Sequence, residues 1–413
     1  MERKAKEKRG ITLIALVVTI VVLLILAGIT INMLFSNGGI FKTAQDAANA
    51  WNEATVNEQE SLNNIADQIG NLVNGQVGGT TPEEPEPPTV PDSWDLTKVT
   101  PIVSEDKIPV YVPVPKGFTQ STVDGEKTVE GGFVIKQDGT NNEFVWIPVD
   151  ETSFNAMYTE VETPVALAGG TGVTTSIYSK SSIYTMVQPG DTSGVREPDL
   201  VTDYDTTSSY QTILGAASTQ EFAQDMVDEY QKIHDSIEQY GGFYIGRYEL
   251  TGDITSPTVV KGGTVIGNQN WYNLKAACMK LVDNTGKQES EITAKTTMIY
   301  GNQWDEVCNW LSSVGYDIED STSWGNYSNN TEEGHGTKQT AGYSENWKAN
   351  NIYDFAGNCL EWTQEAYGTY VRIYRGGVYG NSGSDYSASS YDTNSSDNDT
   401  FSYLSSRPTL YVQ

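Results

Sequence analysis

Residues 354–377 read DFAGNCLEWTQEAYGTYVRIYRGG, and this is the stretch that decides the fold. Its landmarks are Gly357-Asn358, Glu361-Trp362 and Arg375-Gly376-Gly377, and Arg407-Pro408 follows farther along the chain. No cysteine follows Cys359. Because thiolates are the nucleophiles and metal ligands that cysteine supplies, chemistry that needs a pair of them after this point is excluded.

This pattern resembles the C-terminal core of the formylglycine-generating-enzyme family, which has a C-type-lectin-like fold. The strand-like segments FVWIP (144–148) and GGFYIGRYEL (241–250) resemble the same family. The resemblance spans about residues 99–413 and implies an α+β globular head in which Arg375, Gly376, Gly377 and Arg407 are scaffold. Oxidases of the family carry two cysteines shortly after the Arg-Gly-Gly, which bind copper(I). Since both are missing here, we expect a binding protein and not an enzyme, with no copper and no nucleotide cofactor.

The resemblance also implies a calcium site. The family holds calcium with a loop of the form D/N-x-x-G-N-x-x-E, in which Asp354 and Glu361 would supply carboxylates and Gly357 and Cys359 main-chain carbonyls. The alternative is that Glu361 caps or pairs structurally while Asn358 makes a turn, and the residues leave both open. His234 and His335 lack metal-ligand spacing, and we interpret them as surface or packing residues.

The segment 378–406 has an unusual composition. Tyr, Ser, Asn, Asp and Gly dominate it, as in antibody-like binding surfaces. Lys, Glu, Gln, Met and Trp are absent from Ala366 to Val412. None of these residue types has a codon ending in C or T, and adenine-directed mutagenesis of Asn codons never produces them. The segment thereby resembles the variable proteins of diversity-generating retroelements, many of which use this fold. The alternative is a polar loop that lacks those types by chance.

The retroelement resemblance implies that this segment binds an external protein or glycan ligand. Large aromatic side chains are poor choices for an unoccupied solvated loop, so we expect one exposed ligand-binding patch. Its predicted members are Tyr379, Asn381, Asp385, Tyr386, Tyr391, Asp392, Phe401 and Tyr403.

Patterning predicts several elements of the head. A hairpin is expected from GGFVIK (131–136) and EFVWIPV (143–149), and long surface loops over residues 166–216. A helix capped by Ser218 and Thr219 should bury one face, and two further helices are expected over 273–282 and 303–311. The buried face is expected to comprise Phe222, Met226, Tyr230, Ile233 and Ile237. Residues 76–98 are proline-rich and acidic, which favours an extended spacer.

The first 34 residues predict a membrane anchor. A basic head precedes an apolar run from Ile11 to Ile31, long enough to cross a hydrocarbon core of roughly 30 Å. Residues 11–34 are therefore expected in a membrane, with the basic head cytoplasmic and everything after it outside. An ordinary secretory signal is the alternative, but no typical cleavage site follows the run.

Gly10 before ITLIAL resembles the prepilin leader of type IV pilins. The resemblance implies a leader over 1–10, cleavage between Gly10 and Ile11 by a prepilin peptidase, a membrane and stalk helix over 11–75, and a bacterial cell-surface location. Ala15 stands where the family usually has the glutamate that helps a subunit join the fibre. A minor subunit among other pilins, or a simple membrane-anchored protein, fits better than a major pilin, and an uncleaved anchor remains open.

Charge limits the partners. The chain of 413 residues carries 25 Lys+Arg against 54 Asp+Glu, a net charge of −29. Such a chain repels phosphate backbones, so nucleic acid is not an expected partner. The three cysteines are an odd number and are interpreted as buried thiols and not as a disulfide framework.

Overall fold

The computed structural model describes residues 88–166, 174–178, 212–216, 219–366, 371–392 and 396–413. All of them belong to one compact unit, Pro87–Gln413. The expected processing site at Gly10 and Ile11, the membrane segment 11–34, the stalk and most of the spacer lie outside the described residues. Within the described ranges, no helix has both the length and the apolar character needed to cross a bilayer.

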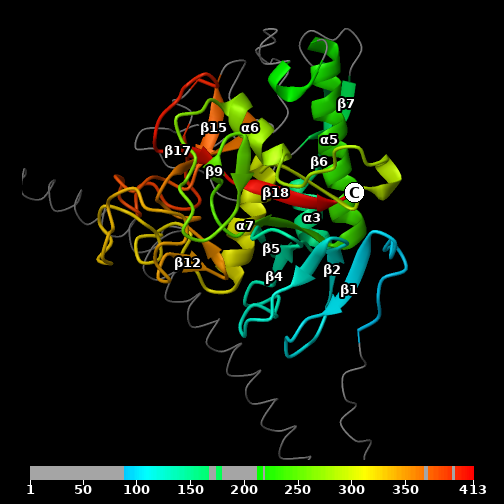
Figure 1. Ribbon diagram of the computed structural model, residues 1–413, viewed down its shortest axis with the longest axis horizontal. Coiled ribbons are helices and arrows are strands. Elements are labelled where there is room, and N and C mark those ends of the chain that lie inside the picture. Colours follow the sequence, from blue (N-terminus) through cyan, green and yellow to red (C-terminus); the bar gives the residue numbers. More distant parts are fainter. Residues whose placement is uncertain (1–87, 167–173, 179–211, 217–218, 367–370, 393–395) are drawn as a thin grey trace, which may run out of the picture. The chain divides into compact units, whose positions relative to one another are not determined.

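A curled antiparallel sheet of six strands organises this unit (Figure 1). The strand order is β11-β18-β8-β5-β4-β3, so the C-terminal strand lies between two strands that precede it by more than a hundred residues. The strands are β3 (Phe118–Gln120), β4 (Val134–Gln137), β5 (Glu143–Pro148), β8 (Gly242–Gly246), β11 (Ala294–Met298) and β18 (Pro408–Val412). The predicted hairpin is confirmed, because β4 and β5 pair in antiparallel register.

Both faces of this sheet are buried. Along β5, Phe144 and Trp146 belong to one hydrophobic cluster, whereas Val145 and Ile147 belong to another. Successive side chains of a strand point to opposite faces, so the two clusters lie on opposite sides of the sheet. This explains why FVWIPV (144–149) is apolar throughout instead of alternating.

Helices complete the two clusters. The helix α6 (Trp271–Met279) contributes to the Phe144 cluster, and α7 (Gly301–Ser313) contributes to the Val145 cluster. The long helix α5 (Thr219–Tyr240) buries Met226, Tyr230, Ile233 and Ile237, which confirms these members of the predicted face. A short helix, α3 (Glu151–Met157), begins at Asp150, whose carboxylate accepts from Ser153 N at 2.7 Å.

Residues 354–377 contribute the strands β14 and β15 to a second sheet. This sheet has four strands in the order β16-β15-β14-β17. Its strands are β14 (Leu360–Ala366), β15 (Arg372–Arg375), β16 (Tyr391–Asp392) and β17 (Leu404–Ser406). The strand β15 runs back antiparallel to β14, and the segment 378–406, which contains β16 and β17, then brings β17 to pair in parallel with β14.

Paired ribbons surround the two sheets. They are β1 (Val99–Val103) with β2 (Tyr111–Pro115), β6 (Thr159–Ala166) with β7 (Thr174–Tyr178), β9 (Thr251–Asp253) with β10 (Ser256–Thr258), and β12 (Lys348–Ala349) with β13 (Ile352–Tyr353). A short 3-10 helix, η1, covers Glu289–Glu291. The expectation of loops throughout 166–216 was wrong at residues 174–178, which form β7. This strand is held by main-chain pairing with β6, and its sequence has no periodic pattern of apolar residues that would predict a strand.

Candidate functional site

A buried ion pair joins the two sheets. Arg407, between β17 and β18, places Nη2 2.7 Å from Glu361 Oε1 and Nε 2.9 Å from Oε2. Its remaining donors reach the carbonyl oxygens of Gly246 and Tyr353, each at 2.9 Å. Both partners of the pair are 1% exposed or less. Such a bidentate pair fixes geometry as well as charge, so it sets the point where the tail leaves one sheet and enters the other.

A second buried arginine fixes the start of the tail. Arg375, at the end of β15, places Nη2 2.8 Å from Glu365 Oε2 and 3.2 Å from Asp305 Oδ1 on α7. Its Nη1 donates to the carbonyl oxygen of Ser389 at 3.1 Å, so the same guanidinium also holds the returning chain. Arg375 and Arg407 thus lie where the scaffold expectation placed them.

Two glycines allow main chains to pass closely here. Gly357 has φ +77°, and a Cβ there would lie 2.2 Å from the carbonyl oxygen of Asn326. Gly377 has φ +71°, and its Cβ would lie 2.2 Å from the carbonyl oxygen of Tyr386. Any other residue at either position would push apart the loops that form the site.

Asn358 connects these loops from the protein interior. It has φ +56° and is fully buried. Its Nδ2 donates to Glu249 Oε2 at 2.6 Å, and its Oδ1 accepts from Asn326 Nδ2 at 3.0 Å and from Gln339 N at 2.9 Å. The other oxygen of Glu249 accepts from Cys359 N at 3.1 Å. One side chain therefore ties the loop before β14 to the loop containing residues 326–339.

The main chain around Asn358 also holds both ends of the tail. Tyr379 N donates to the carbonyl oxygen of Asn358 at 3.1 Å, and Leu360 N donates to the carbonyl oxygen of Tyr403 at 2.9 Å. Residues that are distant in sequence are thereby bound to the two ends of a three-residue stretch.

The first of two surface clusters is formed by residues 379–386, which lie on the loop 321–330. Ser328 N donates to the carbonyl oxygen of Asn381 at 2.8 Å, and Gly383 N donates to Asn329 Oδ1 at 3.0 Å. Asp385 is exposed, and Tyr379, Asn381 and Tyr386 are half-buried. The supporting residue Asn329 was not among the site residues expected from the sequence.

The second surface cluster is an aromatic pair. The rings of Phe401 and Tyr403 stack with centroids 5.3 Å apart and planes 4° apart. Phe401 is 38% exposed, and Tyr403 is half-buried. Two groups of the expected patch residues are thus held by neighbouring main-chain groups, the first by the carbonyl oxygen of Asn358 and the second by the amide of Leu360.

Tyr391 does not belong to either cluster, and this corrects the expectation. It lies in β16, is 9% exposed, and packs with Ile373 in a small hydrophobic cluster. The Arg375 guanidinium lies 5.2 Å from the centroid of its ring. Strand pairing turns this side chain inward, which composition alone does not indicate. Asp392, next in β16, is half-buried.

The residues proposed for calcium do not fit that ion. Both Glu361 oxygens accept hydrogen bonds from Arg407, so a guanidinium occupies the position a cation would need. Asp354 Oδ2 accepts from Gly342 N at 2.6 Å. The geometry instead matches the alternative in which Glu361 pairs structurally and Asn358 makes a turn, with Gly357 and Cys359 serving the fold.

In the described part of the chain, His234, Asp235 and Glu238 on α5 are the three side chains of metal-binding type whose ligand atoms lie within 4.8 Å of one another. The His234 ring packs against Phe154 and Tyr158, with centroids 5.0 and 4.7 Å away. This agrees with its interpretation as a packing residue.

Three buried carboxylates share one guanidinium beneath the site. Glu249, Asp354 and Glu361 are each 2% exposed or less, and Arg407 is the cation that acts on all three. Burial raises the pKa of Asp354 to about 7, and the negative charge of Glu361 adds to this effect. Burial and the charge of Asp354 raise the pKa of Glu249 well above its ordinary value. Among the described residues, Asp354 Oδ1 has no hydrogen-bond partner, so no donor stabilises the charged form at this oxygen.

Comparison with known proteins gives little further information. No protein-family model matches the chain, and no curated protein matches it. Among solved structures, Treponema denticola variable protein 1 is similar at 14% identity, covering 71% of this chain and 99% of that one, with a TM-score of 0.29. The crystal structure of CarF is similar at 14% identity, covering 65% and 98%, with a TM-score of 0.28. Both TM-scores are too low to assign a fold or a function.

We predict that Arg407→Leu lowers the free energy of unfolding by about 3–5 kcal/mol, because it leaves the Glu361 carboxylate buried without its counterion. The double variant Arg407→Leu/Glu361→Leu should lose less than the single one. Urea unfolding measures both. Lys261→Ala is the control, since its pair with Glu345 is exposed and should contribute less than about 1 kcal/mol. Equal losses for the Arg407 and Lys261 variants would contradict a central role for the buried pair.

We predict that the chain loses stability as pH rises from 5 to 7. The pKa of Asp354 is raised in the folded state, so the unfolded chain ionises first and folding must retain a proton. The free energy of unfolding should fall across this window, by about 1.4 kcal/mol per pH unit for each proton that the folded chain retains. Asp354→Asn mimics the protonated acid and should show a shallower slope in urea unfolding across the same pH range. Identical pH profiles for the two chains would show that Asp354 is not the titrating group.

Proposed function

We propose that this chain is a non-catalytic, membrane- or pilus-anchored surface protein whose tail segment 378–406 binds an external protein or glycan. One observation carries the proposal: main-chain hydrogen bonds and buried arginines hold this segment, whereas several of its side chains face outward. Asp385 and Phe401 are exposed, while the amide of Tyr379 and the carbonyl of Tyr403 are bound to residues 358–360.

This arrangement suits sequence variation. A loop held through its main chain keeps its shape when its side chains change, because the hydrogen bonds do not depend on residue type. We also propose that a retroelement diversifies this segment. The absence of Lys, Glu, Gln, Met and Trp from Ala366 to Val412 supports this proposal. We further propose that the head has the C-type-lectin-like fold of formylglycine-generating enzymes, with Arg407 and Glu361 in its core.

The thiols support a binding role over an oxidase role. All three cysteines are free and buried. Burial raises the pKa of the Cys278 thiol to about 12 and raises that of Cys359 well above its ordinary value. A thiol that stays protonated at neutral pH is a poor nucleophile and a poor copper ligand.

We predict that Tyr386→Ala weakens ligand binding and leaves folding intact. Arrays of extracellular proteins and glycans, probed with the full-length chain, provide the ligand, and titration then compares variants. If Tyr386 is a binding hot spot, affinity should fall by about 2 kcal/mol or more, roughly 30-fold. The free energy of unfolding should change by no more than about 0.5 kcal/mol. Tyr343, 49% exposed but outside the segment, is the matched control, and Tyr343→Ala should bind normally. Equal binding by both variants would rule out the tail as the binding surface.

We predict that the mature chain begins at Ile11, because Gly10 follows a basic head and precedes ITLIAL. Mass spectrometry of the surface-exposed protein measures this directly. A mature chain that still carries Met1 would contradict prepilin processing and favour the uncleaved anchor.

A further inference from the structure

One lysine of the head lies in the protein interior. Lys275, on α6, is 1% exposed, and among the described residues it is the only lysine that is buried. Its Nζ lies 2.7 Å from Glu229 Oε1, 2.8 Å from Gln364 Oε1 and 3.0 Å from Thr297 Oγ1. These partners come from α5, β14 and β11, so distant segments of the chain meet at one amine.

The side-chain amide of Gln364 has a fixed orientation beside this amine. Its Oε1 accepts from Lys275, while its Nε2 donates to the carbonyl oxygen of Met298 at 2.7 Å and to Glu229 Oε1 at 3.1 Å. Gln364 is 1% exposed. The amide carbon Cδ is bonded to the oxygen that Nζ contacts, so a short rotation of the lysine side chain brings Nζ to it. Holding an amine and an amide together in this way makes a reaction between them effectively unimolecular.

One oxygen of Glu229 contacts both nitrogens. Oε1 accepts from Lys275 Nζ and from Gln364 Nε2, and Tyr300 Oη donates to the same oxygen at 3.0 Å. A carboxylate in this position can take a proton from the amine and give one to the amide nitrogen. Burial favours the first of these transfers, because two neutral groups cost less to bury than two ions.

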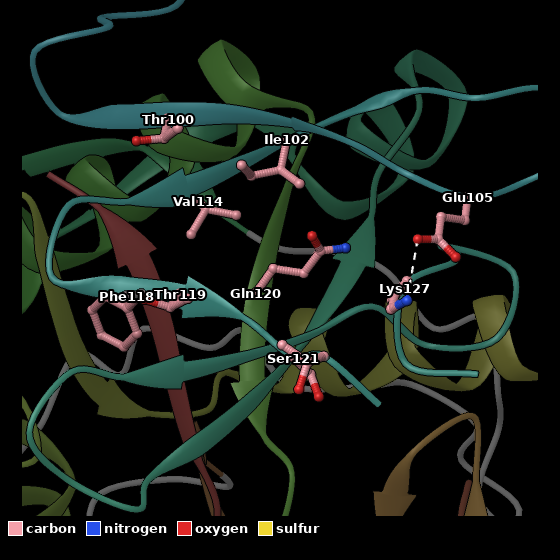
Figure 2. Close-up of a pocket in the computed structure, with 10 residues that line it drawn as sticks. Thr100, Ile102, Glu105, Val114, Phe118, Thr119, Gln120, Ser121 and Lys127 are labelled. Atoms are coloured by element: carbon pink, nitrogen blue, oxygen red, sulfur yellow. Dashed lines mark ion pairs between the residues drawn. The ribbon is translucent and has the colours of Figure 1, made fainter. Parts of the chain in front are cut away.

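A lysine in the groove beside β3 provides a comparison. Lys127 Nζ lies 3.3 Å from Glu105 Oε1 (Figure 2) and 3.4 Å from Asp124 Oδ1. Both carboxylates are more exposed than buried. In the described part of the chain, no side-chain amide hydrogen-bonds Lys127 Nζ. Lys127 therefore has carboxylate partners but neither the amide nor the burial that Lys275 has.

We propose that Lys275 and Gln364 form an isopeptide bond, with Glu229 as the proton carrier. Lys275 Nζ first gives a proton to Glu229, and its lone pair forms a bond to Gln364 Cδ. Glu229 passes that proton to Nε2 and takes up a second one from Nζ. The Cδ–Nε2 bond then breaks with its electron pair on nitrogen, and ammonia leaves. In water the ammonia takes up the proton from Glu229, which restores the carboxylate. An amide replaces an amide, so no oxidant or cofactor is required.

The bond gives the head a covalent tie that its cysteines do not provide, since all three are free. It joins residues that are 89 positions apart, and such a cross-link restricts the unfolded chain. It also attaches α6 to β14, the strand that carries Glu361 and Glu365. These two carboxylates pair with the arginines that hold the ends of the tail, so the bond strengthens the scaffold of the tail segment.

The test is the mass of the folded full-length chain after incubation at neutral pH. Mass spectrometry of the intact chain should give the mass calculated from its measured N-terminus, less one molecule of ammonia. Tryptic digestion should release a branched peptide that joins Lys275 to Gln364, because trypsin does not cut after an acylated lysine. Fragmentation of this peptide locates the bond.

Variants of the chain test the role of each group. Glu229→Gln keeps the size of the side chain but cannot carry the proton, and it should form the bond at least about a hundredfold more slowly. Lys275→Arg keeps the charge and should retain the full mass. Lys127→Arg is the matched control and should lose ammonia as the parent chain does. Thermal unfolding verifies that each variant is folded.

Three outcomes would overturn the proposal. The folded parent chain could retain its full mass, it could lose ammonia without forming a branched peptide, as in succinimide formation at an asparagine, or the branch could join Gln364 to Thr297 instead. A folded Glu229→Gln chain that forms the bond at the parent rate would contradict the role of Glu229. None of these measurements uses a ligand, so this proposal and the proposed binding function fail separately.

Discussion

The buried pair between Arg407 and Glu361 is the interaction on which the rest of the head depends. Removing two charges from water costs several kcal/mol per ion, and the pair is tolerable because every nitrogen of the guanidinium donates a hydrogen bond. Those partners come from β14, from the end of β8 and from β13, so one side chain connects both sheets. The pair also fixes the register at which β17 ends and β18 begins. The tail segment 378–406 is held at its far end by this pair and at its near end by Arg375.

At the candidate site, different groups support the loops and form the surface. Main-chain groups, glycines and buried amides keep the loops in place, while some side chains of the tail, such as Asp385 and Phe401, remain exposed. Asn358 illustrates the first task, because its single amide joins three segments without reaching the surface. Phe401 illustrates the second, because its ring stacks on Tyr403 and remains 38% exposed. The stability of this scaffold depends on pH, because the pKa values of the buried carboxylates Glu249 and Asp354 are raised in the folded chain.

Sequence patterning predicted much of the fold and less of the site. The β4–β5 hairpin followed from two apolar runs around a turn, and the buried face of α5 followed from spacings of three and four residues. The roles of Arg375 and Arg407 followed from a family resemblance. The calcium loop was expected from the same resemblance but does not fit the geometry, because Arg407 reaches both oxygens of Glu361 and nothing in the sequence shows this contact. Tyr391 was misplaced for a related reason, since a two-residue strand in a Ser-rich segment has no readable period.

The sequence by itself determined the local elements, the acidic character of the chain, the lack of a thiol pair after Arg375 and the unusual composition of the tail. These are properties of composition and short-range spacing, and they need no partner far along the chain. Only the tertiary structure decided which tail side chains face outward and which carboxylates share Arg407. Each of these depends on contacts between segments that are far apart in sequence, and such contacts are set by packing and strand register, not by the residues of either segment alone.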